Sequence, residues 1–466
     1  MGSMALRRIA IVGSGLSGLL AAHGLLQAGH EVAVFSERSA SQWLHEARPT
    51  GAAARFELAL AFERELGLAH WEAEAPSVRG VHLTICPEIG NPMLRMVGRF
   101  ASHAQAIDLR LQSHRWMNDF VAAGGKLALG RLDVAELDAI AARHDLVLVA
   151  SGRGALAELF PRNAQRSVYA APQRKVAMVI VKNASHQIDG VPFLPFKNNV
   201  LGPHGETFWL PFHHKDLGPT WCLGFEAVPG GLMDRFDSCK TGHDVVAAGK
   251  SIIRDYLPWE AAWASAIELA DPNGWLCGAI TPTVREPVGR LPSGRVVMPI
   301  GDTAMSLDPI GAQGANLGSK LVRHVVRTIA RTIAADANAR FGAAWMTDTF
   351  ETFWADHGAS TVAFNNMFLA PMSDAGQYLL GSQAGSDGVS DGPAQRIADA
   401  ILANFDDPRL CTEAFTDLAS AHKLVATLSS PPARREVEAV APRVGSGPIR
   451  RVFDTVPAYA SAPVKR

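Results

Sequence analysis

Residues 9–22 read IAIVGSGLSGLLAA, and this stretch carries the clearest fold signal in the chain. An apolar strand over residues 7–13 is followed by glycines with GxGxxG spacing, and then by a helix that we expect to end near Gln27. Residues 31–35, EVAVF, predict a second strand. The strand, helix and strand together form a βαβ unit, which predicts a parallel sheet.

This glycine turn predicts a dinucleotide-binding site. Glycine lets the backbone approach a pyrophosphate closely, and the helix N-terminus supplies free N–H groups and the positive end of its dipole. A tight strand-to-helix turn without any ligand is the alternative. The expected cofactor contacts come from Gly13, Ser14, Gly15, Leu16, Ser17 and Gly18.

The end of the second predicted strand indicates where a ribose would bind. A carboxylate commonly holds the ribose hydroxyls there, but the expected position is Ser36, and Glu37 comes one residue later. Since a shift of one residue turns a strand side chain to the other face, either Glu37 reaches the ribose through a bend or Ser36 binds it more weakly. Arg38 is expected to face the phosphates, with a solvated surface arginine as the alternative.

A second loop with a specific pattern spans residues 301–316, GDTAMSLDPIGAQGAN. A buried strand over 295–300 ends at this loop, and a long helix over 316–335 follows it. The loop therefore delivers a second helix N-terminus, suited to the ribityl hydroxyls and polar ring edge of a flavin. Paired with the first motif, it predicts an FAD site. The expected contacts are Asp302, Asp308, Pro309, Gln313, Gly314, Ala315 and Asn316.

The apolar strand DLVLVA at 145–150 is closed by Ser151 and Gly152. The glycines that follow resemble a second, NAD(P)-binding fingerprint, but no acidic second strand follows at the needed distance. We therefore expect Ser151 and Gly152 at the edge of the FAD site.

The chain is predicted to have an α/β fold in several parts. A Rossmann-like FAD-binding domain is expected over 5–165 and 282–340, interrupted by a mostly β substrate-binding domain at 166–281, where Val, Phe and Trp runs alternate with Pro and Gly turns. Residues 341–428 form a predicted helical C-terminal region. The stretch 429–466, rich in Pro, Ala, Gly and Arg, is predicted to be a flexible tail.

Composition excludes several classes of function. The 466 residues include 44 Lys and Arg against 45 Asp and Glu, so nothing attracts the chain globally to nucleic acid or an anionic membrane. No apolar stretch is long enough for a membrane span. The five cysteines form no CxxC pair and the histidines show no metal spacing, so we expect no metal site. A reduced, cytoplasmic protein without a signal peptide is the expectation.

Together these motifs resemble the oxygenase components of two-component styrene and indole monooxygenases. The likeness covers roughly residues 7–330 and is looser to about 428. Further segments that carry it are ELALAFERELGL, AIDLRLQSHRWMNDFVAAGGKL, HDLVLVASGRGALAELF and the step Pro172-Gln173-Arg174.

The resemblance implies a function shared between two proteins. A separate NADH-dependent flavin reductase, acting as a transient partner, would supply reduced FAD. This chain would react it with O₂ to a C4a-hydroperoxyflavin and transfer one oxygen atom to an apolar aromatic or alkene substrate. Epoxidation of styrene- or indole-like compounds and sulfoxidation are the expected reactions. A ribose carboxylate displaced by one residue fits a flavin that binds reversibly and is released after each turnover. A homodimer is compatible with the helical C-terminal region.

The resemblance also implies roles for single residues. Arg48 matches a family arginine near the flavin ring, and Gly51 stands where styrene-type enzymes carry an asparagine, which enlarges the site and favours a bulkier substrate. Pro309 and Ile310 match the segment that borders the flavin and the substrate. Arg110 lies on a helix that faces the cofactor in related flavoproteins, with a surface salt bridge as the alternative.

Electrophilic oxygen transfer makes few demands on side chains, because the cofactor carries the chemistry. A dry, apolar pocket is needed, and we expect no Ser-His-Asp triad or carboxylate pair. The pocket residues expected from the β domain are Phe193, Phe196, Phe208, Trp209 and Phe212.

Three other functions compete with this interpretation. A self-sufficient hydroxylase would reduce its own FAD with NAD(P)H. A flavin-dependent halogenase would need an active-site lysine, and no lysine is placed to match. A flavin-binding protein without turnover is the non-enzymatic alternative, which Gly51 keeps open.

Overall fold

The computed structural model describes residues 6–188 and 190–430. A six-stranded sheet, here called the Rossmann sheet, has the order β15-β16-β7-β1-β2-β6. Its strands are parallel except for β15, and β1 lies between β7 and β2. This confirms the predicted βαβ unit. The strands are β1 (Arg8–Val12), β2 (Glu31–Ser36), β6 (Lys126–Leu129), β7 (Leu146–Val149), β15 (Gly289–Arg290) and β16 (Val296–Pro299).

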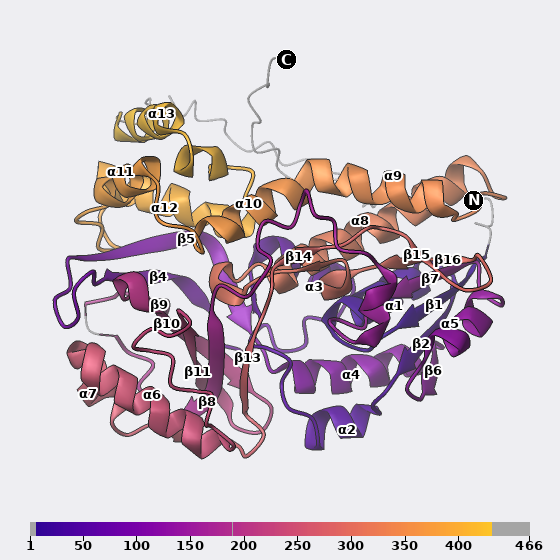
Figure 1. Ribbon diagram of the computed structural model, residues 1–466, viewed down its shortest axis with the longest axis horizontal. Coiled ribbons are helices and arrows are strands. Elements are labelled where there is room, and N and C mark those ends of the chain that lie inside the picture. The colour runs from indigo at the N-terminus through magenta and orange to yellow at the C-terminus, as the bar shows by residue number, and fades with distance from the viewer. Residues whose placement is uncertain (1–5, 189, 431–466) are drawn as a thin grey trace, which may run out of the picture. The chain divides into compact units, whose positions relative to one another are not determined.

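Helices cover both faces of the Rossmann sheet (Figure 1). Successive side chains of β1 alternate between them, as a strand requires. Ile9 and Ile11 pack with α1, α4 and α8, while Ala10 and Val12 pack with α5. The helices are α1 (Leu16–Gln27), α2 (Ala40–His45), α3 (Glu57–Glu65), α4 (Leu109–Ala122), α5 (Val134–Ala141) and α8 (Gly314–Ala335).

A nine-stranded sheet, here called the large sheet, forms the mostly β part of the molecule. Its order is β12-β8-β11-β10-β9-β4-β5-β3, and β13 also pairs with β8. The strands are β3 (Ala54–Arg55), β4 (Val78–Ile85), β5 (Leu94–Ala106), β8 (Lys175–Lys182), β9 (Pro195–Val200), β10 (Gly205–His214), β11 (Gly218–Ala227), β12 (Glu268–Leu269) and β13 (Trp275–Ala279).

The large sheet corrects the predicted domain boundaries. Three of its strands, β3, β4 and β5, come from the segment that the sequence assigned to the FAD-binding domain over 5–165. The parallel pairing of β4 with β9 joins this early hairpin to the strands of 166–281. The β-rich part is therefore built from both segments, and a boundary at residue 166 does not separate them.

The two faces of the large sheet pack against different partners. One face, with Trp209 and Trp221, lies against α6 (Gly242–Tyr256) and α7 (Pro258–Ala264). The opposite face carries Leu210, Phe212 and an apolar cluster that also includes residues of the Rossmann part. Because β10 alternates between these faces, its odd- and even-numbered side chains have different neighbours.

The C-terminal segment is helical, as predicted for 341–428, and α12 packs on β5 of the large sheet (Figure 1). Its helices are α9 (Ala343–Phe353), α10 (Ala359–Met367), α11 (Asp374–Ser382), α12 (Pro393–Asp406) and α13 (Leu418–Ser429). Of the predicted tail 429–466, residues 431–466 lie outside the described residues.

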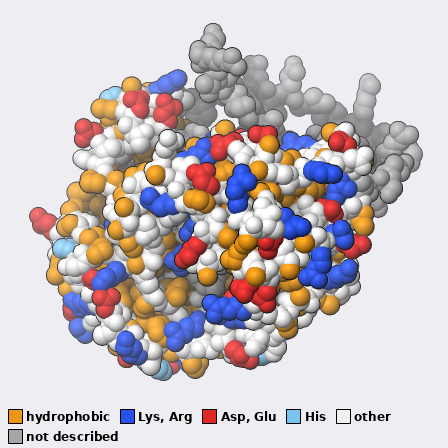
Figure 2. Space-filling view, turned by 45° about the vertical axis from the view of Figure 1, so that its right-hand side comes forward, with side chains coloured by type: hydrophobic (Ala, Val, Ile, Leu, Met, Phe, Trp, Pro, Cys, Tyr) orange, Lys and Arg blue, Asp and Glu red, His pale blue; other side chains and the backbone are white. Residues whose placement is uncertain are grey.

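The described surface mixes charges of both signs. On the face shown in Figure 2, acidic and basic side chains alternate with apolar ones rather than gathering by sign. Within residues 6–188 and 190–430, no helix combines the length and apolar character that a bilayer crossing requires.

Candidate functional site

The predicted cofactor motifs meet at one edge of the Rossmann sheet. Gly13, Ser36, Ser151 and Gly301 each stand at the carboxyl end of one of its parallel strands or within two residues after it. Ligands of open α/β sheets bind at this edge. The fold therefore brings together residues from four distant parts of the sequence.

The first glycine turn has the close contacts that only glycine permits. Gly13 has a φ of 115°, and a Cβ on Gly18 would collide with the backbone oxygen of Gly13. A Cβ on Gly15, by contrast, would meet nothing within 4 Å. No side chain caps the first turn of α1. The turn thus leaves open space and free N–H groups where a pyrophosphate would lie.

The second loop packs directly on this turn. A Cβ on Gly301 would lie 2.5 Å from the Ser17 hydroxyl, so the two motifs touch. Asp302 reaches solvent beside Gly314 at the uncapped N-terminus of α8. Partial loss of hydration raises the pKa of Asp302. This carboxylate is suited to accept hydrogen bonds from hydroxyl groups of a ligand.

The two predicted ribose ligands differ in the structure, because Ser36 is held by hydrogen bonds and Glu37 lies on the surface. The Ser36 hydroxyl is buried, lies 2.6 Å from the Ser14 hydroxyl and donates to the backbone oxygen of Arg38. Trp43 Nε1 donates to the same Ser14 hydroxyl at 2.8 Å. Glu37 is exposed and lies 3.8 Å from Arg131 on the surface. The chain bends at Glu37 and Arg38 directly after β2, and the Glu37 side chain lies on the surface at this bend.

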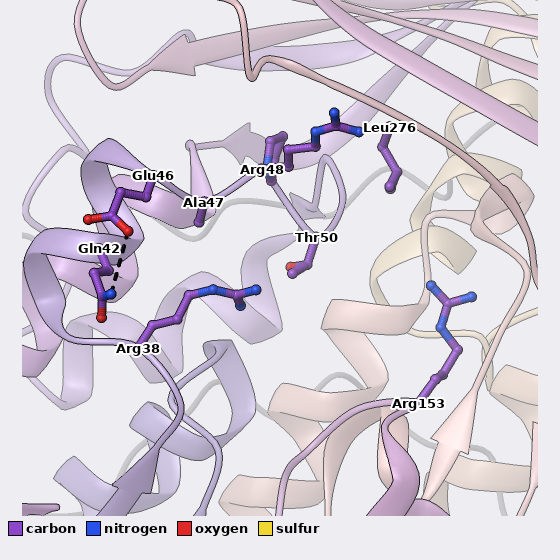
Figure 3. Close-up of a pocket in the computed structure, with 9 residues that line it drawn as sticks. Arg38, Gln42, Glu46, Ala47, Arg48, Thr50, Arg153 and Leu276 are labelled. Atoms are coloured by element: carbon purple, nitrogen blue, oxygen red, sulfur yellow. Dashed lines mark hydrogen bonds between the residues drawn. The ribbon is translucent and has the colours of Figure 1, made fainter. Parts of the chain in front are cut away.

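A recess of about 550 Å³ lies beside this edge and holds three arginines. Arg38 extends toward Thr50, and Arg153 lies on the other side of Thr50 (Figure 3). Arg48 stacks on the ring of Trp275 with its guanidinium carbon 4.0 Å from the ring centre. The arrangement is strongly attractive to an anion such as a diphosphate. The full lining is Arg38, Gln42, Glu46, Ala47, Arg48, Pro49, Thr50, Arg153 and Leu276.

Arg153 is a site residue that the sequence interpretation missed. It lies between Gly152 and Gly154, in a turn for which the sequence predicted contacts from Ser151 and Gly152 alone. A basic residue between two glycines at the carboxyl end of a parallel strand was the available signal.

The prediction that Arg110 contacts the cofactor is wrong. Its guanidinium is fully buried and donates to both carboxylates of Asp108 and Asp271 at 2.7–3.1 Å. His214 also contacts Asp271 at 2.6 Å. This buried network ties α4 to the large sheet, and it is not the surface salt bridge considered as the alternative.

Three polar residues of the second loop also hold the chain itself. Gln313 donates to the backbone oxygens of Gly311 and Phe405, and Asn316 donates to those of Ala54 and Ala312. Asp308 is fully buried and accepts from the N–H of Ile310. Their side chains therefore shape the loop, while Gly314 and Ala315 at the start of α8 are half-buried.

The residues expected to border the substrate fall into two groups in the structure. Gly51, Pro309 and Ile310 are half-buried, and a Cβ on Gly51 would meet nothing within 4 Å. Phe196, Phe208 and Phe212 belong to the apolar cluster between the large sheet and the loops, together with Phe56, Phe100, Ala52 and Ala312.

Trp209 and Phe193 lie elsewhere. Trp209 faces α7, packs against Trp263 and donates to Glu260 at 2.8 Å. The prediction for Trp209 is wrong because β10 turns every second side chain to that opposite face. Phe193 packs over Gly80 and Gly388.

The residues present fit an FAD molecule. Two uncapped helix N-termini, the open space over Gly15 and the arginine recess match a dinucleotide. In addition, Ser151 Oγ and Gln313 Oε1 are buried without a hydrogen-bond partner near the sheet edge. Buried polar atoms normally have partners, so these two atoms are consistent with a ligand contact.

Comparison with known families agrees with this geometry. Residues 152–262 match the family described as styrene monooxygenase A putative substrate binding domain. Residues 11–60 match the NAD(P)-binding Rossmann-like domain.

Two curated relatives cover most of the chain. Styrene monooxygenase StyA of Pseudomonas fluorescens is 24% identical over 319 residues, which cover 67% of this chain and 75% of the relative. Styrene monooxygenase StyA of a Pseudomonas species is 24% identical over 320 residues, with the same coverage.

Solved structures share the fold. A flavoprotein/dehydrogenase from Cytophaga hutchinsonii superposes with a TM-score of 0.63 at 13% identity, covering 91% of this chain and 99% of its own. A triple mutant of the flavin-dependent brominase Bmp2 gives a TM-score of 0.61 at 15% identity, covering 89% and 99%. At these identities the likeness concerns the fold alone.

The comparisons confirm the predicted resemblance to styrene monooxygenases and the Rossmann-like fold class. The two curated relatives are styrene monooxygenases, in agreement with the prediction of a flavin-dependent monooxygenase.

Proposed function

We propose that this chain is the FAD-dependent oxygenase component of a two-component monooxygenase. It would take reduced FAD from a separate NADH-dependent flavin reductase and insert one oxygen atom from O₂ into an apolar aromatic or alkene substrate. The observation that carries the proposal is the contact between the two glycine motifs beside an apolar face of the large sheet.

Two regions of the site would bind two different parts of FAD. The N–H groups of α1 and the arginines of the recess would hold the diphosphate, while the backbone at Gly314 and the Asp302 carboxylate would hold the ribityl chain. When bound, reduced FAD supplies the activated oxygen, and the chain has only to position and shield it.

The part of the site expected to bind the ribose favours exchange of FAD with solvent. Its usual carboxylate ligand is replaced by Ser36, whose hydroxyl is occupied by Ser14 and Arg38. An FAD held without that contact binds less tightly, which suits a flavin that is delivered by a partner. The exposure of Arg38, Arg48 and Arg153 in the recess agrees with this view.

The apolar cluster would hold the substrate and exclude water. Phe56 contacts the rings of Phe100 and Phe196 edge-to-face, with centroids 5.4 Å and 6.3 Å apart. Pro309 and Ile310 would close the pocket toward the flavin. Gly51 leaves space there, which favours a substrate larger than styrene.

The decisive experiment supplies the purified chain with FAD, NADH and an unrelated flavin reductase. Indole, styrene and an aryl sulfide are tested by mass spectrometry for a product heavier by one oxygen atom. The product must disappear when the reductase is left out. NADH consumption without the reductase would instead indicate a self-sufficient hydroxylase, and FAD binding without turnover of any larger substrate would indicate a binding protein.

A further inference from the structure

Two carboxyl groups meet in the interior beneath the second cofactor loop. Glu226 on β11 and Asp308 are each fully buried, and their carboxyl groups are in hydrogen-bonding contact. Neither Glu226 oxygen has a partner among hydrogen-bond donors of the described residues, and neither has Asp308 Oδ2. The sequence interpretation expected no carboxylate pair, and β11 gave no local sign of one.

The surrounding charges do not neutralise this pair. Glu206 lies directly opposite Glu226 in the pairing of β10 with β11. Arg174, at the entry to β8, donates to both oxygens of Glu206 at 2.9 and 3.0 Å. Tyr169 is a further titratable neighbour of Asp308, and its hydroxyl donates to the backbone oxygen of Asn366. One guanidinium therefore faces three carboxyl groups.

The pair consequently holds a proton at neutral pH. Two carboxylates in contact inside a protein cannot both be ionised. Burial raises the pKa of Glu226 well above its usual range and raises the pKa of Asp308 to about 6. Asp308 is the anionic partner because its Oδ1 accepts the N–H of Ile310 at 3.1 Å. Glu226 is then the acid that donates to Asp308 Oδ2.

Asp308 is the first residue of a loop that is held in an unfavourable conformation. Ala312 has a φ of 53°, which is rare for a residue other than glycine. Asn316 Nδ2 donates to the backbone oxygen of Ala312 at 2.7 Å, and Asn365 Nδ2 donates to that of Asp308 at 3.1 Å. Glu226 is the anchor that reaches this loop from the large sheet.

We propose that Glu226 is a positioning residue: the proton it shares with Asp308 anchors the loop over residues 308–312 to the large sheet, in the shape that the flavin requires. The inference rests on the proposed function, because that function places a flavin against this loop. Loss of the proton would leave two facing carboxylates, which repel each other and release the loop.

Oxidised FAD binding as a function of pH provides the test. Because burial raises the pKa of Glu226 well above its usual range, flavin fluorescence titrations should run from neutral to alkaline pH. For the wild-type chain we expect the FAD dissociation constant to rise about tenfold over this range, as the shared proton is lost. Glu226→Gln replaces the acid by an amide that still donates and does not titrate, so its affinity should stay level. Glu226→Ala should bind weakly at every pH.

A matched control is Glu158→Gln, an exposed glutamate in the short helical turn Ala155–Leu159, which should retain the wild-type profile. If Glu226→Gln does not fold, Asp308→Asn removes the like charge from the other side and should also level the profile. Identical pH profiles for the wild-type chain and both variants would overturn the proposal.

A second measurement separates this inference from the proposed function. If no variant binds FAD, the proposed function fails, but chemical unfolding of the protein alone still tests the pair. The folded chain holds the Glu226 proton at pH values where the unfolded chain has lost it, so wild-type stability should decline as pH rises toward the folded-state pKa. Glu226→Gln should lack this decline, and an equal decline in both proteins would refute the shared proton.

Discussion

The guanidinium carbon of Arg48 lies 4.0 Å from the centre of the Trp275 ring, so that the loop after α2 is tied to β13 of the large sheet. Trp275 is buried and Arg48 is exposed in the recess. A guanidinium that stacks on an aromatic face keeps its N–H edge free for an anion. Arg48 therefore joins two parts of the fold and still presents a positive charge to the recess.

Arg48→Ala is expected to raise the FAD dissociation constant at least about tenfold, because a charged hydrogen-bond donor is lost. Trp275→Leu should weaken binding less, by about two- to fivefold, since it removes only the stacking that orients Arg48. Flavin fluorescence titration measures both. Arg143→Ala, on the exposed surface after α5, serves as the control. Unchanged FAD affinity in Arg48→Ala would show that Arg48 does not contact the cofactor.

Two glycines of the first turn are expected to respond differently to alanine. In Gly18→Ala the new methyl group collides with the backbone of Gly13, which should cost about 1–3 kcal/mol of stability or more. In Gly15→Ala the methyl group enters open space, so the stability should stay within about 1 kcal/mol while FAD binding weakens at least about tenfold. Thermal unfolding and flavin titration of both variants check this. Full FAD affinity in Gly15→Ala would place the pyrophosphate elsewhere.

Gly51→Asn is expected to narrow the substrate pocket. Because a Cβ at this position meets nothing within 4 Å, the variant should fold like the wild type. We expect turnover to shift toward styrene and indole relative to bulkier aromatic substrates, by roughly tenfold in the ratio of kcat/KM values. Gly51→Ala adds volume without an amide and separates the two effects. An unchanged ratio in both variants would exclude Gly51 from the pocket.

Because of Lys320, the free energy of unfolding is expected to increase as the pH rises from about 8 toward 10.5. Its side chain is buried on α8, where Nζ donates to the backbone oxygen of Asp406. Burial lowers the pKa of Lys320 from 10.5 to about 8. Between these values the unfolded chain binds more protons than the folded chain, so the contribution of this group to stability increases as pH rises.

Lys320→Met should remove this increase, which amounts to about 3 kcal/mol at most. Urea unfolding near pH 7.5 and near pH 10 would give the free energies of unfolding for both proteins. Lys423→Met, on the exposed side of α13, should behave like the wild type. If Lys320→Met and the wild type gain the same stability between the two pH values, Lys320 is not the group responsible.

The missed hairpin of β4 and β5 shows where sequence patterns fail. The pairing of these strands shifts register between Val78 and Gly80, which interrupts the regular alternation that marks a strand. Its second strand, β5, ends at Ala106, and α4 begins at Leu109, so the strand and the helix follow each other almost without a break. The place of the hairpin in the large sheet depends on β9, whose sequence lies far along the chain.

Arg110 and Trp209 illustrate a second limit. A motif predicts that a residue type stands at a position, but the direction and partners of its side chain depend on elements that arrive from elsewhere. The Arg110 guanidinium donates hydrogen bonds to Asp271, and α7 packs over Trp209.

By itself the sequence determined the two glycine turns, the parallel strands that end at them and the helices that begin there. These features depend on backbone conformations and apolar periods that neighbouring residues encode together. Only the tertiary structure decided that Arg153 joins Arg38 and Arg48, that Ser36 is occupied, and that Glu226 meets Asp308. The physical reason is that burial and the choice of polar partners are set by contacts between residues distant in sequence, and no local pattern records them.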